Sequence, residues 1–83
     1  MLKEKIKNSV IEIIVSLCSK EIDFQKDINL IDEHVLDSVV FVQMISLIEK
    51  EFNIKFSLFD LDIQNFKSVN SIVSTVTEVI QNN

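Results

Sequence analysis

The sequence predicts a small all-α protein, and three observations support this prediction. The 83 residues contain no Gly and no Pro, which argues against tight β-hairpins and favours helices joined by polar loops. Apolar residues make up 47% of the chain, enough to form a folded core. These residues recur at helical spacing over much of the chain. We therefore expect one domain over residues 1–83, a four-helix bundle with a long first loop and a short third helix.

The first and last helices follow from the spacing of apolar residues. From Leu2 to Leu17 they are mostly three or four positions apart, while Lys and Glu occupy the other faces. Ser68 precedes the last helix, where its hydroxyl can accept a hydrogen bond from a free backbone N–H. The apolar face of that last helix consists of Val69, Ile72, Val73, Val76, Val79 and Ile80. A short segment around Phe59 to Phe66 predicts one or two turns of a third helix.

Residues 19–37 form a long acidic connection between the first and second helices. Helical periodicity fades after Cys18, and residues 21–37 carry six carboxylates but only one Lys. A loop this long is uncommon in a small domain and is often functional. We expect its apolar residues to hold it against the core: Ile22, Phe24, Ile28, Leu30, Ile31, Val35 and Leu36.

The second helix is predicted to run from Ser38 to about Phe52. At about 100° per residue, one side of this helix is an apolar stripe. The stripe consists of Phe41, Met44, Ile45, Ile48 and Phe52. The opposite, solvated face carries Gln43, Ser46 and Lys50. Val39, Val40 and Leu47 belong to neither side, so this helix has more apolar surface than a half-buried helix requires.

Composition and charge exclude several classes of function. A net charge of −5 without any Arg argues against nucleic acid as a partner. The one cysteine cannot form an internal disulfide, and no Cys/His cluster is present for a metal, which fits a cytoplasmic protein. No apolar run reaches the length of a membrane span. No second polar group is placed to work with Ser38, so we expect no catalytic residues and no enzyme activity. We also expect the protein to be a monomer.

The segment LIDEHVLDSVVFVQMISLIEKEFNIKF, residues 30–56, resembles the phosphopantetheine-binding family of acyl, aminoacyl and peptidyl carrier proteins. The family pattern is an Asp-Ser pair, here Asp37-Ser38, then an apolar residue and an amphipathic helix. That helix closes on a Glu-Phe-x-Ile unit, here residues 51–54. The resemblance also covers the apolar first helix, the acidic connection, the short third helix and the final helix. It therefore implies the acyl-carrier-protein fold for nearly the whole chain.

This resemblance implies a carrier whose Ser38 is a tether. A phosphopantetheinyl transferase would attach the 4'-phosphopantetheine arm of coenzyme A to the Ser38 hydroxyl, and Asp37 would present Ser38 to that transferase. The carrier would shuttle an acyl or aminoacyl thioester from a loading ligase, adenylation enzyme or acyltransferase to condensing or downstream transfer enzymes. Such carriers serve fatty acid, polyketide and nonribosomal peptide biosynthesis. The alternative reading of the residues is a small helical interaction domain in which Ser38 only caps a helix.

Two features depart from the family pattern. His34 lies where many members have Gly before the Asp-Ser pair, and we expect it to be a turn residue that tolerates positive φ. Fatty-acid carriers line the exposed face of the second helix with carboxylates, whereas this chain has Val39, Val40, Gln43 and Leu47 there. These four are candidate docking residues, although Val40 and Leu47 could instead border the core. The pattern VLDSVVFVQM is more similar to free-standing D-alanyl and aminoacyl carriers.

Overall fold

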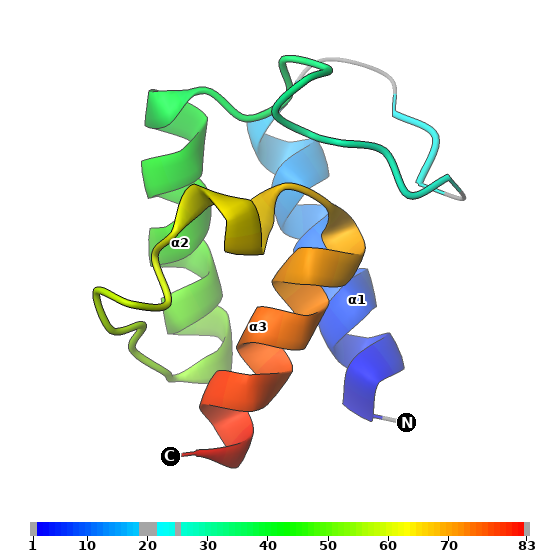
Figure 1. The fold of residues 1–83 in the computed structure, drawn as a ribbon. Coiled ribbons are helices and arrows are strands. Elements are labelled where there is room, and N and C mark those ends of the chain that lie inside the picture. Colours follow the sequence, from blue (N-terminus) through cyan, green and yellow to red (C-terminus); the bar gives the residue numbers. More distant parts are fainter. Residues whose placement is uncertain (1, 19–21, 25, 83) are drawn as a thin grey trace.

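The computed structural model describes residues 2–18, 22–24 and 26–82. This part of the chain forms three α-helices, α1 Leu2–Leu17, α2 Ser38–Phe52 and α3 Val69–Gln81, and one 3₁₀ helix, η1 Ile63–Phe66. Both α2 and α3 run antiparallel to α1, and η1 lies between α2 and the start of α3 (Figure 1). The all-α class and the extents of α1 and α2 are confirmed.

The predicted third helix is a single 3₁₀ turn, so the expected count of four helices is not confirmed. It begins at Ile63 instead of Phe59, because the preceding residues form a separate turn. In that turn the Asp60 carboxylate accepts hydrogen bonds from the backbone N–H and the hydroxyl of Ser57, each at 2.9 Å. Asp62 then caps η1 by accepting a hydrogen bond from the Gln64 N–H. The Asp60 carboxylate thus closes the turn before η1, and the Asp62 carboxylate caps η1 itself. These side-chain hydrogen bonds limit the length of η1.

The core is built from one face of each helix. Ile6, Val10 and Ile14 of α1 are fully buried, as are Met44 and Ile48 of α2. Phe66 of η1 is also fully buried, and it contacts Phe41 and Phe56 edge to face at ring-centroid distances of 5.3 and 5.5 Å. Edge-to-face pairs add about 0.5–1.5 kcal/mol each beyond the burial of their area. The three rings therefore join η1 to α2 and to the segment that follows it.

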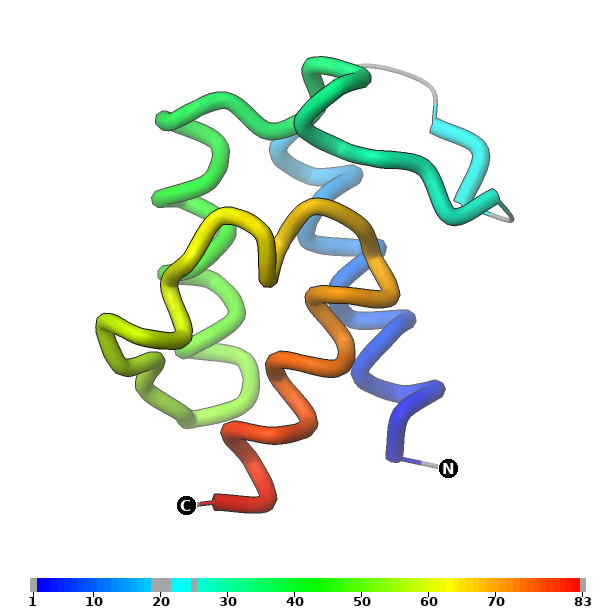
Figure 2. Tube along the Cα trace, viewed as in Figure 1, coloured from blue at the N-terminus to red at the C-terminus, as the bar shows by residue number. Residues whose placement is uncertain are grey.

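The acidic connection crosses the end of the molecule where α1 ends and α2 and α3 begin (Figure 2). Its residues 19–21 and 25 lie outside the described part of the chain. The predicted apolar anchors are confirmed: Leu30, Val35 and Leu36 are buried, and the others are partly buried. The Leu30 N–H donates to the carbonyl of Lys67, at 2.6 Å, which ties the connection to the start of α3.

A tight turn precedes α2 and depends on the backbone of His34. The Leu30 carbonyl accepts hydrogen bonds from the N–H groups of Val35 and Leu36, at 2.8 and 3.1 Å. His34 adopts φ of 59°, the left-handed region in which Gly is favoured. Its side chain is exposed, so the residue serves the turn through its backbone. The expectation that His34 is a turn residue with positive φ is confirmed.

We expect His34→Val to lower the free energy of unfolding by about 1–2 kcal/mol, because a β-branched residue fits the left-handed region poorly. His34→Gly should cause no comparable loss. Urea unfolding followed by circular dichroism measures both variants. Equal losses in the two variants would assign the effect to the imidazole and contradict this account.

Candidate functional site

The first turn of α2 is capped by Asp37. Asp37 has an extended backbone, with φ of −103°, and its side chain accepts a hydrogen bond from the Val40 N–H at 2.8 Å. Its carbonyl accepts the Phe41 N–H at 2.9 Å. Ser38 is already the first residue of the helix. The interpretation of Ser38 as the helix cap is therefore wrong, because the carboxylate before it holds that position and its negative charge suits a helix N-terminus.

Because the Asp37 carboxylate accepts the hydrogen bond from the Val40 N–H, the hydroxyl of Ser38 is not needed to cap α2. Ser38 is exposed, and its hydroxyl forms no hydrogen bond with any residue in the described part of the chain. Two buried residues immediately upstream, Val35 and Leu36, hold the chain that leads to it. A phosphodiester on Ser38 would lie against the first turn of α2, where free N–H groups and the helix dipole favour an anion. The site therefore fits a group attached through a phosphate.

Helical geometry separates the residues of α2 by their angle from Ser38. Val42 lies about 40° around the helix from Ser38 and Glu49 about 20°, whereas Leu47 lies on the opposite side. Val42 is 62% exposed. Sequence reasoning did not single it out as a candidate contact; its position four residues after Ser38 indicates the side of the helix on which it lies but not its exposure. Val42 is thus an exposed apolar residue on the same side of α2 as the hydroxyl.

The structure divides the four candidate docking residues. Val39 is 65% exposed, and Gln43 is also exposed. Leu47 is 38% exposed and borders the surface. Val40 is partly buried and packs against the core. Val39 and Gln43 therefore have the exposure that a docking residue needs, and Val40 contributes mainly to packing.

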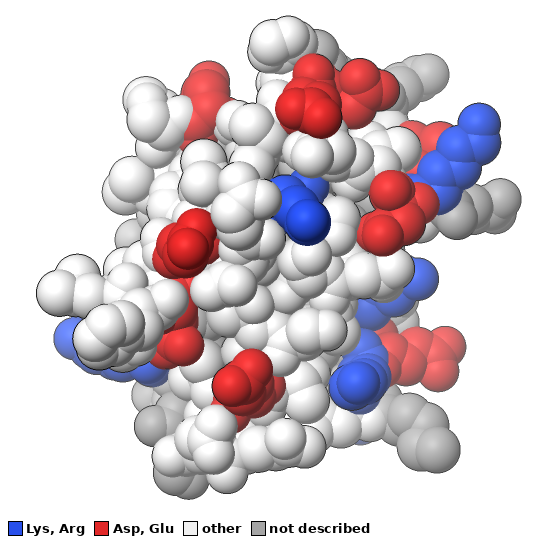
Figure 3. Space-filling model, viewed as in Figure 1, with Lys and Arg blue, Asp and Glu red and all other residues white. Residues whose placement is uncertain are grey.

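Charged side chains are scattered over the face of the molecule that Figure 3 shows. Figure 3 shows carboxylates separated by wide uncharged areas on one face of the molecule. Within the described residues, no cluster of His, Cys, Asp and Glu could hold a metal ion. None of the helices in residues 2–18, 22–24 and 26–82 combines the length and apolar character needed to cross a membrane. The exposed hydroxyl of Ser38 at the start of α2 is the candidate site, and it belongs to the Asp-Ser pair that the sequence pattern indicates.

An exposed serine hydroxyl at the start of a helix is accessible for the covalent attachment of a group. The model of the family described as "Phosphopantetheine attachment site" matches residues 8–76. This chain therefore belongs to the phosphopantetheine-binding family of carrier proteins. Members of that family are not enzymes, and they carry 4'-phosphopantetheine covalently.

Curated relatives point to one subgroup of this family. The chain is 35% identical over 74 residues to a D-alanyl carrier protein of Streptococcus sanguinis, strain SK36. It is 34% identical over 74 residues to a D-alanyl carrier protein of Streptococcus gordonii. Both alignments cover 89% of this chain and 94% of the relative. The similarity thus extends over nearly the whole of each protein.

The different roles of Asp37 and Ser38 predict different costs of substitution. Asp37→Ala should lower the free energy of unfolding by about 1 kcal/mol, because the Val40 N–H loses its acceptor. Ser38→Ala should change it by less than about 0.5 kcal/mol, as expected for an exposed side chain. Thermal and urea unfolding of the unmodified protein measure both values. A larger loss for Ser38→Ala than for Asp37→Ala would show that the hydroxyl is the cap after all.

Proposed function

We propose that Ser38 is the attachment point of the 4'-phosphopantetheine arm and that the protein carries D-alanine on it as a thioester. The observation that carries this proposal is the exposed hydroxyl of Ser38, which Asp37 leaves free by capping α2. The arm supplies a thiol on a linker far longer than any side chain of this protein. Residues of this chain then only anchor and present that arm.

Three groups of enzymes act on such a carrier. A phosphopantetheinyl transferase modifies Ser38 and recognises Asp37 beside it. A ligase that activates the cargo with ATP loads the thiol, and a downstream transfer enzyme receives the cargo. Docking to these enzymes uses the exposed apolar residues Val39 and Val42, with Gln43 beside Val39 and weak electrostatic steering.

D-Alanine is proposed as the cargo on two grounds. Relatives that align over nearly their full length are D-alanyl carrier proteins. In addition, the rings of Phe41, Phe56 and Phe66 occupy the space between α2 and η1, so cargo on the arm would stay outside the core. A small polar group is stable in that solvated position, whereas a long acyl chain would leave apolar surface in water. We further propose that residues 1–83 act as one carrier domain in the cytoplasm.

The attachment is tested by incubating the purified protein with coenzyme A and a broad-specificity phosphopantetheinyl transferase, followed by intact mass spectrometry. Wild-type protein should gain the mass of one phosphopantetheine, and Ser38→Ala should gain none. Ser46→Ala is the matched control, since Ser46 is an exposed serine on the same helix, and it should be modified like wild type. A folded wild-type protein that gains no mass, or a modified Ser38→Ala, would refute the proposed site.

The docking role of Val39 is tested by loading kinetics. Val39→Asp should lower the rate of D-alanine loading by the ATP-dependent ligase of the same organism about tenfold at low carrier concentration. Its free energy of unfolding should change by less than about 0.5 kcal/mol. Val40→Asp should instead destabilise the fold by about 1–3 kcal/mol, because a carboxylate replaces a residue packed on the core.

Val15→Asp on α1 is the matched control for Val39→Asp, because Val15 is 55% exposed and lies on a different helix. It should be loaded at the wild-type rate. Loading of Val39→Asp at the wild-type rate would remove Val39 from the docking surface.

A further inference from the structure

The turn between α2 and η1 presents two adjacent large apolar side chains to solvent. Leu58 is 89% exposed and Phe59 is 90% exposed. Burying such a side chain is worth about 1.5–3 kcal/mol, so leaving two neighbours uncovered forgoes a sizeable stabilisation. An uncharged protrusion stands out beside α2 in this region (Figure 3). We call Leu58 and Phe59 the apolar tip.

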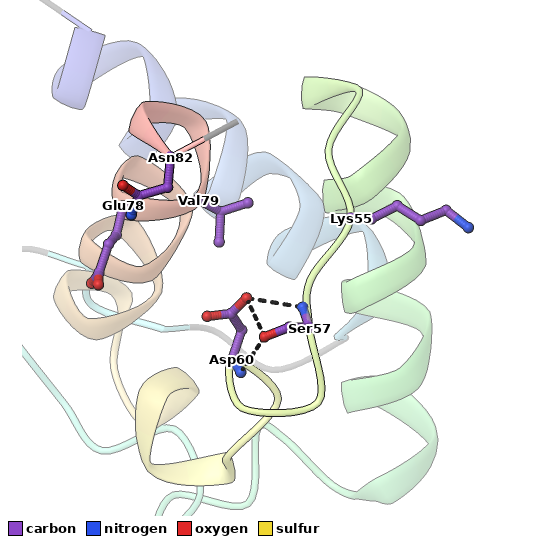
Figure 4. A pocket seen from close by; sticks show the side chains of 6 residues that line it. All are labelled: Lys55, Ser57, Asp60, Glu78, Val79 and Asn82. Carbon is purple, nitrogen blue, oxygen red and sulfur yellow. Dashed lines mark hydrogen bonds between the residues drawn. The ribbon is translucent and has the colours of Figure 1, made fainter.

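Hydrogen bonds hold the turn that carries the apolar tip. The carboxylate of Asp60 accepts from the backbone N–H and the hydroxyl of Ser57, and the Asp60 N–H donates back to the Ser57 hydroxyl oxygen at 3.3 Å (Figure 4). The side-chain amide of Asn65 donates to the Asp60 carbonyl at 3.1 Å, which ties the turn to η1. The tip is therefore presented in an ordered conformation, so little entropy is lost when a partner covers it.

A further contact places the tip relative to Ser38. The N–H of Phe56 donates to the Glu49 carboxylate at 2.9 Å, so the segment entering the turn lies against Glu49. Glu49 lies about 20° from Ser38 around α2 and about 16 Å along its axis. Val42 lies on the same side of α2 and falls between Ser38 and Glu49 along the helix. One side of α2 thus leads from the attachment point, past an exposed valine, to the turn that carries the apolar tip.

Charge around the turn indicates the character of the partner. Asp60 and Glu78 border one groove at the base of the tip, and the exposed Asp62 follows the turn. Lys55 also lines this groove, and its side chain extends away from the two carboxylates (Figure 4). Together with the net charge of −5, these carboxylates disfavour an anionic lipid surface. Two copies that met tip to tip would bury far less than the roughly 1,200 Å² of a stable interface.

We propose that the apolar tip inserts into an apolar pocket, bordered by basic side chains, on the ligase that loads the arm on Ser38. This inference rests on the proposed function. The tip anchors the enzyme at a fixed distance from Ser38, and Val42 lies within the same contact. A buried aromatic anchor with a preorganised backbone is the usual source of binding energy in interfaces of this kind.

The test compares loading of D-alanine onto wild-type carrier and the double variant Leu58→Ser/Phe59→Ser by the ATP-dependent ligase of the same organism. All proteins are first converted to the phosphopantetheine form, and conversion is verified by intact mass. The double variant should raise the KM for the carrier about tenfold or more, with kcat within about twofold, because the lost contacts act in binding. Its melting temperature should be unchanged, since both side chains are exposed.

Leu2→Ser/Val15→Ser is the matched control, because these residues are 52% and 55% exposed and lie on α1. Its KM should equal that of wild type. Normal loading of wild type with an unchanged KM in the tip variant would overturn this inference and leave the proposed function intact. Failure of the ligase to load modified wild type would overturn the proposed cargo and this inference with it.

Two further measurements separate other occupants of the tip. Wild-type protein should not sediment with phosphatidylglycerol vesicles and should remain a monomer in analytical ultracentrifugation. Vesicle binding that the double variant abolishes would assign the tip to a lipid surface. A dimer that the same variant abolishes would assign it to a second copy of the chain. Either result would overturn the proposed pocket on the ligase.

Discussion

The hydrogen bond from the Val40 N–H to the Asp37 carboxylate sets the geometry of this protein. It makes Asp37 the cap of α2, and it thereby makes Ser38 the first residue of the helix, with its hydroxyl exposed. In the proposed carrier, capping and attachment are thus assigned to two neighbouring side chains. If one serine had both roles, modification of its hydroxyl would remove the acceptor that starts the helix. An aspartate cap allows the helix to remain capped whether or not Ser38 carries a group.

The chain on both sides of Asp37 is held so that this bond can form. Upstream, Leu30, Val35 and Leu36 are buried, and the left-handed backbone of His34 closes the turn between them. Downstream, Phe41 packs edge to face on the buried ring of Phe66 and fixes the rotation of α2 against η1. The solvated Ser38, the proposed attachment point, is therefore supported by packed residues within a few positions of it. An attached arm can then move while the helix start beneath it does not.

Most of the fold was predictable, because it depends on apolar spacing along the chain. The bounds of α1 and α2 and the Ser68 cap of α3 follow from that spacing and from local capping rules. The cap of α2 was assigned to the wrong residue, since Asp and Ser both favour that position and only the backbone geometry decides between them. Phe59 was placed in a helix because the sequence does not distinguish an apolar side chain on an exposed turn from one in the core. Val42 was missed because its exposure depends on what covers α2.

The proposed carrier therefore joins three features on one side of α2: the free hydroxyl of Ser38, the exposed Val42 and the turn bearing Leu58 and Phe59. The most direct test of the central claim is the ¹H–¹⁵N correlation spectrum before and after phosphopantetheine is transferred, together with hydrogen exchange of the Val40 amide. The account predicts shifts confined to the first turns of α2 and its approach, with Val40 equally protected in both forms. Loss of that protection, or shifts spread through the core, would show that the Ser38 hydroxyl belongs to the fold and contradict the division between Asp37 and Ser38.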